Sequence, residues 1–135
     1  FAVRNSGAIS VIEGCDSNGC EYMTGGTVVI LGEVGDNFAA GMTGGMAFVY
    51  DPVKEFEKRV NPETVIWQPL ETEYWIKYLK SLINEHTKET NSLFSKKIIE
   101  KFDLEVKNFV QVCPKEMVEK LKNPLSYGSK FKKVI

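Results

Sequence analysis

One pattern occurs three times within the first 51 residues, and its copies are spaced 19 residues apart. Each copy begins near a glycine and continues as a run of four or five mostly apolar residues; the aligned glycines are Gly7, Gly26 and Gly45. The two later copies share the string Met-Thr-Gly-Gly, at residues 23–26 and 42–45. A fixed period of this kind is typical of repeat architectures, in which each copy stacks on the copy before it.

The contents of one repeat indicate what kind of unit is stacked. Each copy holds a single short run of β-branched and aromatic residues, bounded by glycine and small polar residues, with no segment long enough for a helix. This describes one coil of a β-solenoid, whose equivalent runs lie as parallel strands about 4.8 Å apart. The pattern predicts two interior columns of side chains, one of Ile9, Val28 and Ala47 and the other of Val11, Ile30 and Val49.

Recurrent glycines suit the corners of such a stack. A coil that turns at the same place each time needs a residue there that accepts positive φ or lets two backbones approach closely. We therefore predict a structural role for the glycines of the repeat, and no catalytic, cofactor-binding or metal-binding residues in this chain. The predicted structural positions are Gly7, Gly25, Gly26, Gly41, Gly44 and Gly45.

Several strings along the chain closely resemble the glycine-motif C-terminal domain of the glutamate synthase large subunit. They cover nearly the whole sequence, and Cys-Glu-Tyr-Met-Thr-Gly-Gly is the most specific of them. The strings are residues 1–8, 19–26 and 37–45 in the repeats, and residues 82–92 and 109–114 in the second half. We expect membership of that family.

The resemblance implies both a fold and a larger parent enzyme. The fold is a right-handed parallel β-helix, here with coils of about 19 residues, that has no active site of its own. The parent enzyme it implies releases ammonia from glutamine in an amidotransferase domain with an N-terminal cysteine nucleophile. A barrel domain carrying FMN and an iron–sulfur cluster then converts ammonia and 2-oxoglutarate to glutamate, with NAD(P)H or ferredoxin as the electron donor. The other domains of the large subunit are the expected partners.

The second half of the chain reads as mainly helical. We place the last solenoid coils in residues 1–61 and a helical segment packed on them in residues 62–135, within one domain. A helix is predicted from Thr72, as its cap, to Thr90, because Trp75, Leu79, Leu82 and His86 have the spacing of a buried face.

The sequence predicts a further helix, two short extended stretches and a last helix in the second half. We predict a second helix after Ser92 that buries Leu93, Ile98 and Phe102. Short extended stretches are predicted at residues 65–68 and 109–113, and a last helix from Pro114 to about Lys122. The basic tail at residues 130–135 is expected to fray.

Composition excludes several classes of protein. Residues 1–51 hold one basic and six acidic side chains, whereas residues 52–135 hold 16 basic and 12 acidic, which gives −5 and +4. This near balance argues against a general nucleic-acid binder, and no run of 18 apolar residues exists for a membrane span. Three cysteines, without secretory context, favour a reducing compartment. The resemblance implies the cytoplasm or, in some eukaryotes, a plastid.

Three kinds of active site find little support in the residues. Gly14 and Gly19 have the spacing of a phosphate-binding loop, but Cys20 stands where the lysine is required. A zinc set would need Cys15, Cys20, Cys113 and His86, whose spacing lacks a tight cysteine pair. Catalysis finds no nucleophile with a positioned base, since His86 is the only histidine and Ser6 and Ser10 belong to the repeat.

Two other kinds of solenoid protein are alternatives. A hexapeptide-repeat acyltransferase or carbonic anhydrase disagrees with the 19-residue period and the single histidine. The structural β-solenoid subunit of formylmethanofuran dehydrogenase is the nearer alternative, against which the second-half strings argue. A small NADPH-oxidising subunit as partner stays open. Because Phe1 lies inside a repeat, we also expect earlier coils upstream and an uncovered edge on the first strand.

Overall fold

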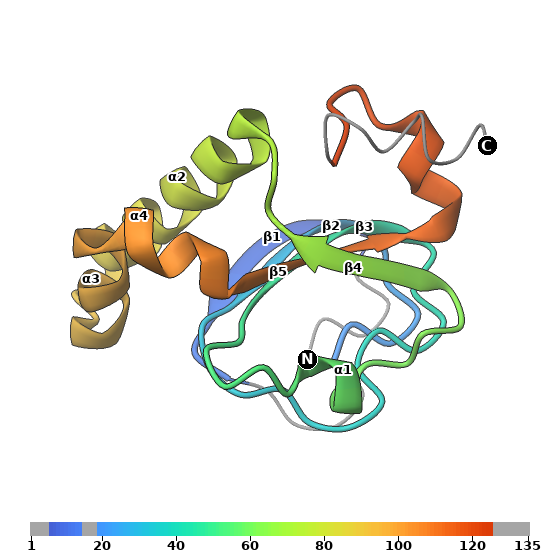
Figure 1. Ribbon diagram of the computed structural model, residues 1–135, viewed down its shortest axis with the longest axis horizontal. Coiled ribbons are helices and arrows are strands. Elements are labelled where there is room, and N and C mark those ends of the chain that lie inside the picture. The colour runs from blue at the N-terminus through green and yellow to red at the C-terminus, as the bar shows by residue number, and fades with distance from the viewer. Residues whose placement is uncertain (1–5, 15–18, 126–135) are drawn as a thin grey trace.

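The fold centres on one mixed sheet of five strands with helices beside it. The computed structural model describes residues 6–14 and 19–125. The strand order across the sheet is β1-β2-β3-β5-β4. The last strand in the chain, β5, therefore lies between β3 and β4. Figure 1 shows the sheet with the arm of helices α2 to α4 at one end and the connecting loops with α1 beneath it.

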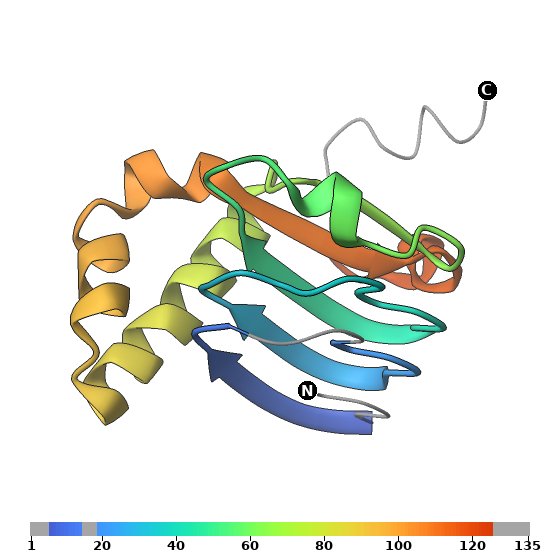
Figure 2. The same cartoon turned by 90° about the horizontal axis from the view of Figure 1, so that it is seen from below.

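The three repeats form the parallel part of the sheet. Their strands are β1 (Ser6–Ile12), β2 (Thr24–Ile30) and β3 (Gly44–Tyr50). β1 pairs with β2 and β2 with β3, both in parallel. In Figure 2 the three strands lie one above another and point the same way. The repeat pattern therefore does encode stacked parallel strands.

The other two strands close the stack from the second half of the chain. β5 (Phe109–Pro114) pairs antiparallel with β3, and β4 (Val65–Pro69) pairs antiparallel with β5. These strands confirm the two predicted extended stretches. The neighbour of the third repeat is thus a strand that lies about 60 positions further along the chain, as in the pair Ala47 and Val112.

The predicted right-handed parallel β-helix is wrong as a description of this fold. The sheet is mixed and is not closed into coils: beyond β3 the pairing turns antiparallel. The described return segments hold no further strand, since their one ladder contact is an isolated bridge between Phe38 and Val60. A fixed period predicts stacking, but it carries no information on which segment pairs with the last copy or on how the connections close.

The return segments nevertheless stack on one another through backbone hydrogen bonds. Ala39 donates its N–H to Gly19 O at 2.8 Å, and Tyr22 donates to Ala40 O at 2.8 Å. Phe38 in turn donates to Arg59 O at 2.9 Å. These bonds satisfy backbone groups in the loops in the same way that the ladder satisfies them in the strands.

The predicted side-chain columns are shifted by one residue in the first copy. Val28 pairs with Ala47 and Ile30 with Val49, as predicted, but the partners of Val28 and Val29 in β1 are Ser10 and Val11. A register irregularity between Ser6 and Ile9 causes the shift. Because side chains alternate between faces, a slip of one residue moves them to the other face. Ile9 is accordingly 60% exposed rather than buried.

Each face of the sheet has its own hydrophobic cluster. The loop-side cluster lies towards the return segments and α1 (Phe56–Arg59) and includes Val28, Ile30, Ala47 and Val49. The helix-side cluster joins the opposite strand residues, Val29 and Phe48 among them, to the helices. Its helical members are Trp75, Leu79, Ile83, Ile98 and Phe102.

The helical predictions are largely confirmed. α2 (Glu73–Thr90) has Thr72 as its N-cap residue, although the Thr72 hydroxyl makes no capping bond and donates to Pro124 O. α3 (Leu93–Glu100) begins after Ser92, whose hydroxyl accepts from Ser95 N. Ile98 and Phe102 are buried as predicted.

Two details of the helical part differ from prediction. Leu93 is 74% exposed; it is the first residue of α3, whose buried residues are Ser95 and Ile98. The last predicted α-helix is a 3-10 helix, η2 (Lys115–Lys120), preceded by the short α4 (Phe102–Glu105) and η1 (Val106–Asn108) before β5. The tail at 130–135 lies outside the described residues. Within the described chain, no helix combines the length and apolar character needed to cross a membrane.

Candidate functional site

Two of the predicted structural glycines, Gly26 and Gly45, meet at the start of β2 and β3. Gly26 and Gly45 have φ of 87° and 83°, in the left-handed region that side chains disfavour. They are also in close contact, since a Cβ added to Gly45 would lie 2.7 Å from Gly26 O. Backbone conformation therefore favours glycine at both positions, and at Gly45 the lack of space favours it as well.

The other four predicted glycines have different surroundings. Gly44 lies against the preceding strand, where an added Cβ would come 2.0 Å from Thr24 O. Gly41 lies under the ring of Tyr22, and Gly25 is opposite Ser6 in the ladder. Gly7 has no neighbour within 4 Å of an added Cβ and has no positive φ. The first glycine of the repeat thus differs from its two counterparts.

Sequence reasoning identified only Gly41 in a second set of repeated corners, because the other three residues of the set are not glycines. Cys20 and Ala39 have φ of 59° and 65°, and Tyr22 and Gly41 have φ of 54° and 65°. Both pairs are 19 residues apart, the period of the repeat. Aligning Tyr22 with Gly41 was the available signal, since a glycine in one copy marks a conformation that its counterpart must share.

His86 was predicted to lie on the buried face of its helix, and its ring also contacts the carboxylate of Glu13. Its Nε2 lies 3.1 Å from Glu13 Oε2, and its side chain is 12% exposed. Hydrogen bonding from Ser92, and then from His86, lowers the pKa of Glu13 below its usual range. The contact joins the end of β1 to the junction of α2 and α3.

The cysteines considered for a metal site do not come together. Cys20 belongs to the loop-side cluster and Cys113 to the helix-side cluster, and both are fully buried. Cys15 lies outside the described residues. Across residues 6–14 and 19–125, no group of three His, Cys, Asp or Glu side chains could hold a metal ion.

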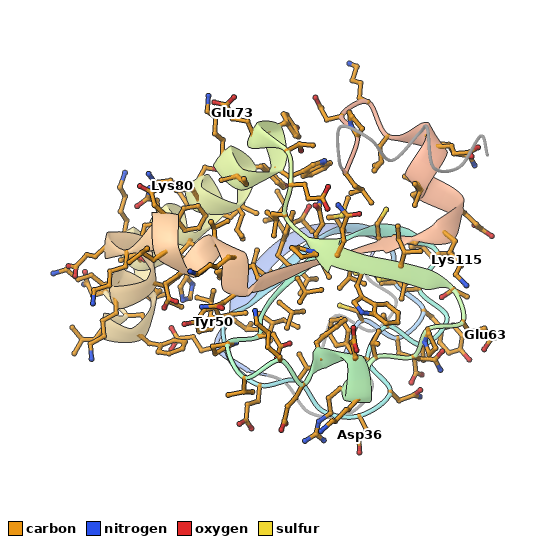
Figure 3. All side chains as sticks on the ribbon, in the orientation of Figure 1. Asp36, Tyr50, Glu63, Glu73, Lys80 and Lys115 are labelled. Carbon is orange, nitrogen blue, oxygen red and sulfur yellow. The ribbon has the colours of Figure 1, made fainter. Side chains whose placement is uncertain are left out.

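A polar network fixes the end of β3. Tyr50 donates its hydroxyl to Glu105 Oε2 at 2.6 Å, and Asn108 Nδ2 donates to Glu105 Oε1 at 2.9 Å. Lys54 extends the network by donating to Asn108 Oδ1 at 3.2 Å. Burial, followed by the bond to Glu105, raises the pKa of Tyr50 to about 12, so the phenol stays protonated at neutral pH. Figure 3 places Tyr50 where the sheet meets the helical arm.

A cavity of about 340 Å³ lies beyond the carboxyl ends of β2 and β3. Val34, Val53, Phe56 and Phe94 are among its apolar lining residues. The charged side chains that line it are Glu33, Asp51, Glu55 and Arg59. Open sheets commonly bind ligands or partners at this end of their parallel strands. Sequence reasoning did not identify the cavity, because its walls come from three separate segments.

These features define a glycine-dependent stack of parallel strands with helices attached to one face. The chain belongs to the GXGXG motif family, whose model matches residues 1–115. The similar proteins are glutamate synthases. The glutamate synthase [NADPH] large chain of Azospirillum brasilense is 58% identical over 125 residues, which cover 93% of this chain and 8% of the relative.

Two further relatives extend the comparison across bacteria and yeast. The glutamate synthase [NADPH] large chain of Bacillus subtilis is 47% identical over 90% of this chain and 8% of its own length. The glutamate synthase [NADH] of Schizosaccharomyces pombe is 48% identical over 86% of this chain and 6% of its own length. The chain therefore corresponds to a segment of glutamate synthase and spans less than a tenth of the curated relatives it matches.

Proposed function

We propose that this chain is a structural segment that holds the glutaminase and synthase domains of a glutamate synthase in fixed relative positions. The parent reaction would convert glutamine, 2-oxoglutarate and a reductant to two molecules of glutamate, as the family resemblance implies. The relatives, which are glutamate synthases of 47–58% identity, favour this function over that of the formylmethanofuran dehydrogenase subunit.

The observation that carries the proposal is the double attachment of the parallel strands. Hydrophobic clusters cover both faces of the sheet, and each cluster includes residues from both 1–61 and 62–135. A sheet anchored on both faces resists bending, because interiors packed this closely transmit strain rather than absorb it. We propose that the two parts act as one rigid domain and that the six glycines have structural roles.

The chemistry is proposed to lie in other domains. An iron–sulfur cluster needs several cysteine thiolates at one point, and Cys20 and Cys113 belong to opposite faces of the sheet. The described residues thus do not fit a cluster site. FMN, the cluster and the donor, NAD(P)H or ferredoxin, would act elsewhere in the parent, with a small NADPH-oxidising subunit as a candidate partner. A cytoplasmic or plastid location belongs to the same proposal.

The test uses the full-length enzyme with Gly45→Val and, as matched control, Gly7→Val. Gly45 has left-handed φ and no space for a side chain, whereas Gly7 has open space. We expect Gly45→Val to reduce glutamine-dependent synthesis and to release free ammonia, while synthesis from added ammonia persists. Retention of that second activity separates misplaced domains from an unfolded protein. Unchanged coupling in Gly45→Val, with the variant strand shown to be perturbed, would reject the spacer role.

Gly45→Ala provides a milder perturbation if valine abolishes both activities. It adds one methyl group at the same left-handed position. Partial uncoupling is expected, since small displacements between sites that share an intermediate are costly.

A further inference from the structure

The cavity beyond β2 and β3 has walls that are held in place before anything binds. Phe94 contacts the ring of Tyr50 edge-on at 6.2 Å between centroids, and Tyr50 is fixed by its bond to Glu105. Lys54, which follows the lining residue Val53 in the chain, donates to Lys107 O at 3.3 Å and to Asn108. Preorganised walls of this kind lower the cost of binding, because little ordering remains to be done.

The turn that carries Val53 is fixed from several directions. Asp51 accepts hydrogen bonds from the backbone of Glu55 and Phe56, both at 3.0 Å, through its two carboxylate oxygens. The Asp51 N–H donates to Asn108 O at 2.7 Å. The turn is therefore an ordered surface, and it holds Val53 outward with 67% of the residue exposed.

The exposed apolar groups are too spread out for a small ligand alone. Phe94 is 42% exposed and Leu93, beside it on α3, is 74% exposed. A small molecule that filled about 340 Å³ would leave Leu93 in water, because Leu93 does not line the cavity. Apolar patches with polar rims mark contacts with other protein surfaces. The occupant expected from this geometry is a polypeptide segment.

The charge of the rim specifies the occupant further. Three carboxylates, of Glu33, Asp51 and Glu55, line the cavity together with one guanidinium, of Arg59, which leaves an excess of two negative charges. Arg59 is already engaged, since its Nη1 lies 2.9 Å from Asp36 Oδ1. Glu33 and Glu55 are both exposed. Complementarity therefore calls for lysine or arginine next to the apolar side chain that enters the cavity.

The source of the segment follows from the length of the relatives. This chain aligns with only 8% of the large chain in Azospirillum brasilense, so most of that polypeptide lies outside the segment. A site and a segment on the same polypeptide meet at high effective concentration, so a modest contact suffices. We propose that the cavity lined by Val53, Phe94, Glu33 and Glu55 docks a basic, apolar segment from another domain of the same large chain. This inference rests on the proposed function, because it gives the spacer a point of attachment.

The experiment places a photo-reactive amino acid, p-benzoylphenylalanine, at Val53 in the full-length enzyme. The same substitution at Leu104, which is 62% exposed and does not line the cavity, is the matched control. After irradiation, mass spectrometry should identify a cross-linked peptide from outside this segment of the same polypeptide, with lysine or arginine beside apolar residues. No cross-link above the Leu104 control, an acidic peptide, or a peptide from a different polypeptide would overturn the proposal.

Charge reversal supplies the second measurement. Glu33→Lys combined with Glu55→Lys should lower the Val53 cross-link yield by about tenfold, the equivalent of about 1.4 kcal/mol, because like charges would then face each other. The double Gln variant should have an intermediate yield. An unchanged yield in the Lys variant would overturn the charge complementarity and with it the proposal. A Val53 cross-link in an enzyme whose Gly45 variants stay fully coupled would leave the docking in place and reject only the spacer role.

Discussion

The repeated strands and the second half of the chain are held together by different means. Within the repeats, neighbouring strands are about 19 residues apart in sequence and contact each other through backbone, as at Gly26 and Gly45. The second half reaches the repeats over 50 or more positions, and there side-chain contacts add to the β3–β5 ladder, as in the bonds from Thr27 to Tyr78 and from Tyr50 to Glu105. The comparison teaches that one sheet can combine a local stack, which depends on backbone conformation at glycines, with a long-range attachment, in which side-chain packing supports a strand ladder.

The strongest test of this difference is Phe48→Ala, at the seam between the two parts. Phe48 is fully buried on β3 and its ring lies 6.1 Å from that of Trp75 and 6.2 Å from that of Tyr78. We expect a loss of about 3–5 kcal/mol, the usual cost of removing a buried aromatic ring. Hydrogen exchange of the sheet amides in the full-length enzyme measures it. Leu93→Ala, at an exposed site, should cost less than about 0.5 kcal/mol, and equal losses would contradict the assignment of the seam.

What the sequence could predict follows the same division. The strands of the repeats, α2 and the start of α3 at Ser92 were predicted correctly because their signals are local: a run of apolar residues, a buried stripe or a cap. The partner of β3 was not predicted, because the pairing of Phe48 with Gln111 depends on packing between distant segments. That missing neighbour is the reason the solenoid prediction failed.

In the candidate site, too, some features could be predicted from the sequence and others could not. The glycines at positions 26 and 45 stand out in the sequence, and both have the positive φ that favours glycine. The cavity depends on Val53 and Phe94, which are 41 positions apart and carry no periodic signal. A register irregularity of a single residue near Ser6 was equally invisible, and it reversed the face of Val11.

The backbone-dependent part of the comparison is tested by Gly45→Ala against Gly7→Ala. Alanine at Gly45 would adopt left-handed φ and crowd Gly26 O, and we expect a loss of about 2 kcal/mol from the two effects together. Alanine at Gly7 should cost less than about 0.5 kcal/mol or be neutral. Exchange rates of the β2 and β3 amides report both variants. Similar losses would mean that the two glycines are equivalent after all.

Thr72 and Ser92 are both N-cap residues, but only the Ser92 side chain makes a capping hydrogen bond. Ser92→Ala should destabilise the start of α3 by about 1 kcal/mol, because the Ser92 hydroxyl accepts from Ser95 N. Thr72→Ala should leave the start of α2 unchanged and loosen residues 123–125 instead, since the Thr72 hydroxyl donates to Pro124 O at 3.3 Å. Residue-level hydrogen exchange distinguishes the two outcomes. Faster exchange in the first turn of α2 would show that Thr72 caps it.

The smallest expected effect is a pH dependence at the contact between β1 and the helices. The pKa of Glu13 is lowered in the folded state, so its stabilising contribution is present above the ordinary glutamate pKa of about 4.3 and is lost as pH falls through the folded value. Because the Glu13 side chain is 40% exposed, solvent screens the contact and limits its strength. We expect the protection of the last turn of α2 against hydrogen exchange, corrected for the intrinsic exchange rate at each pH, to fall as Glu13 becomes protonated. Glu13→Gln should remove that acid step without changing the exchange of β3, and an acid step that persists in Glu13→Gln would assign it to another carboxylate.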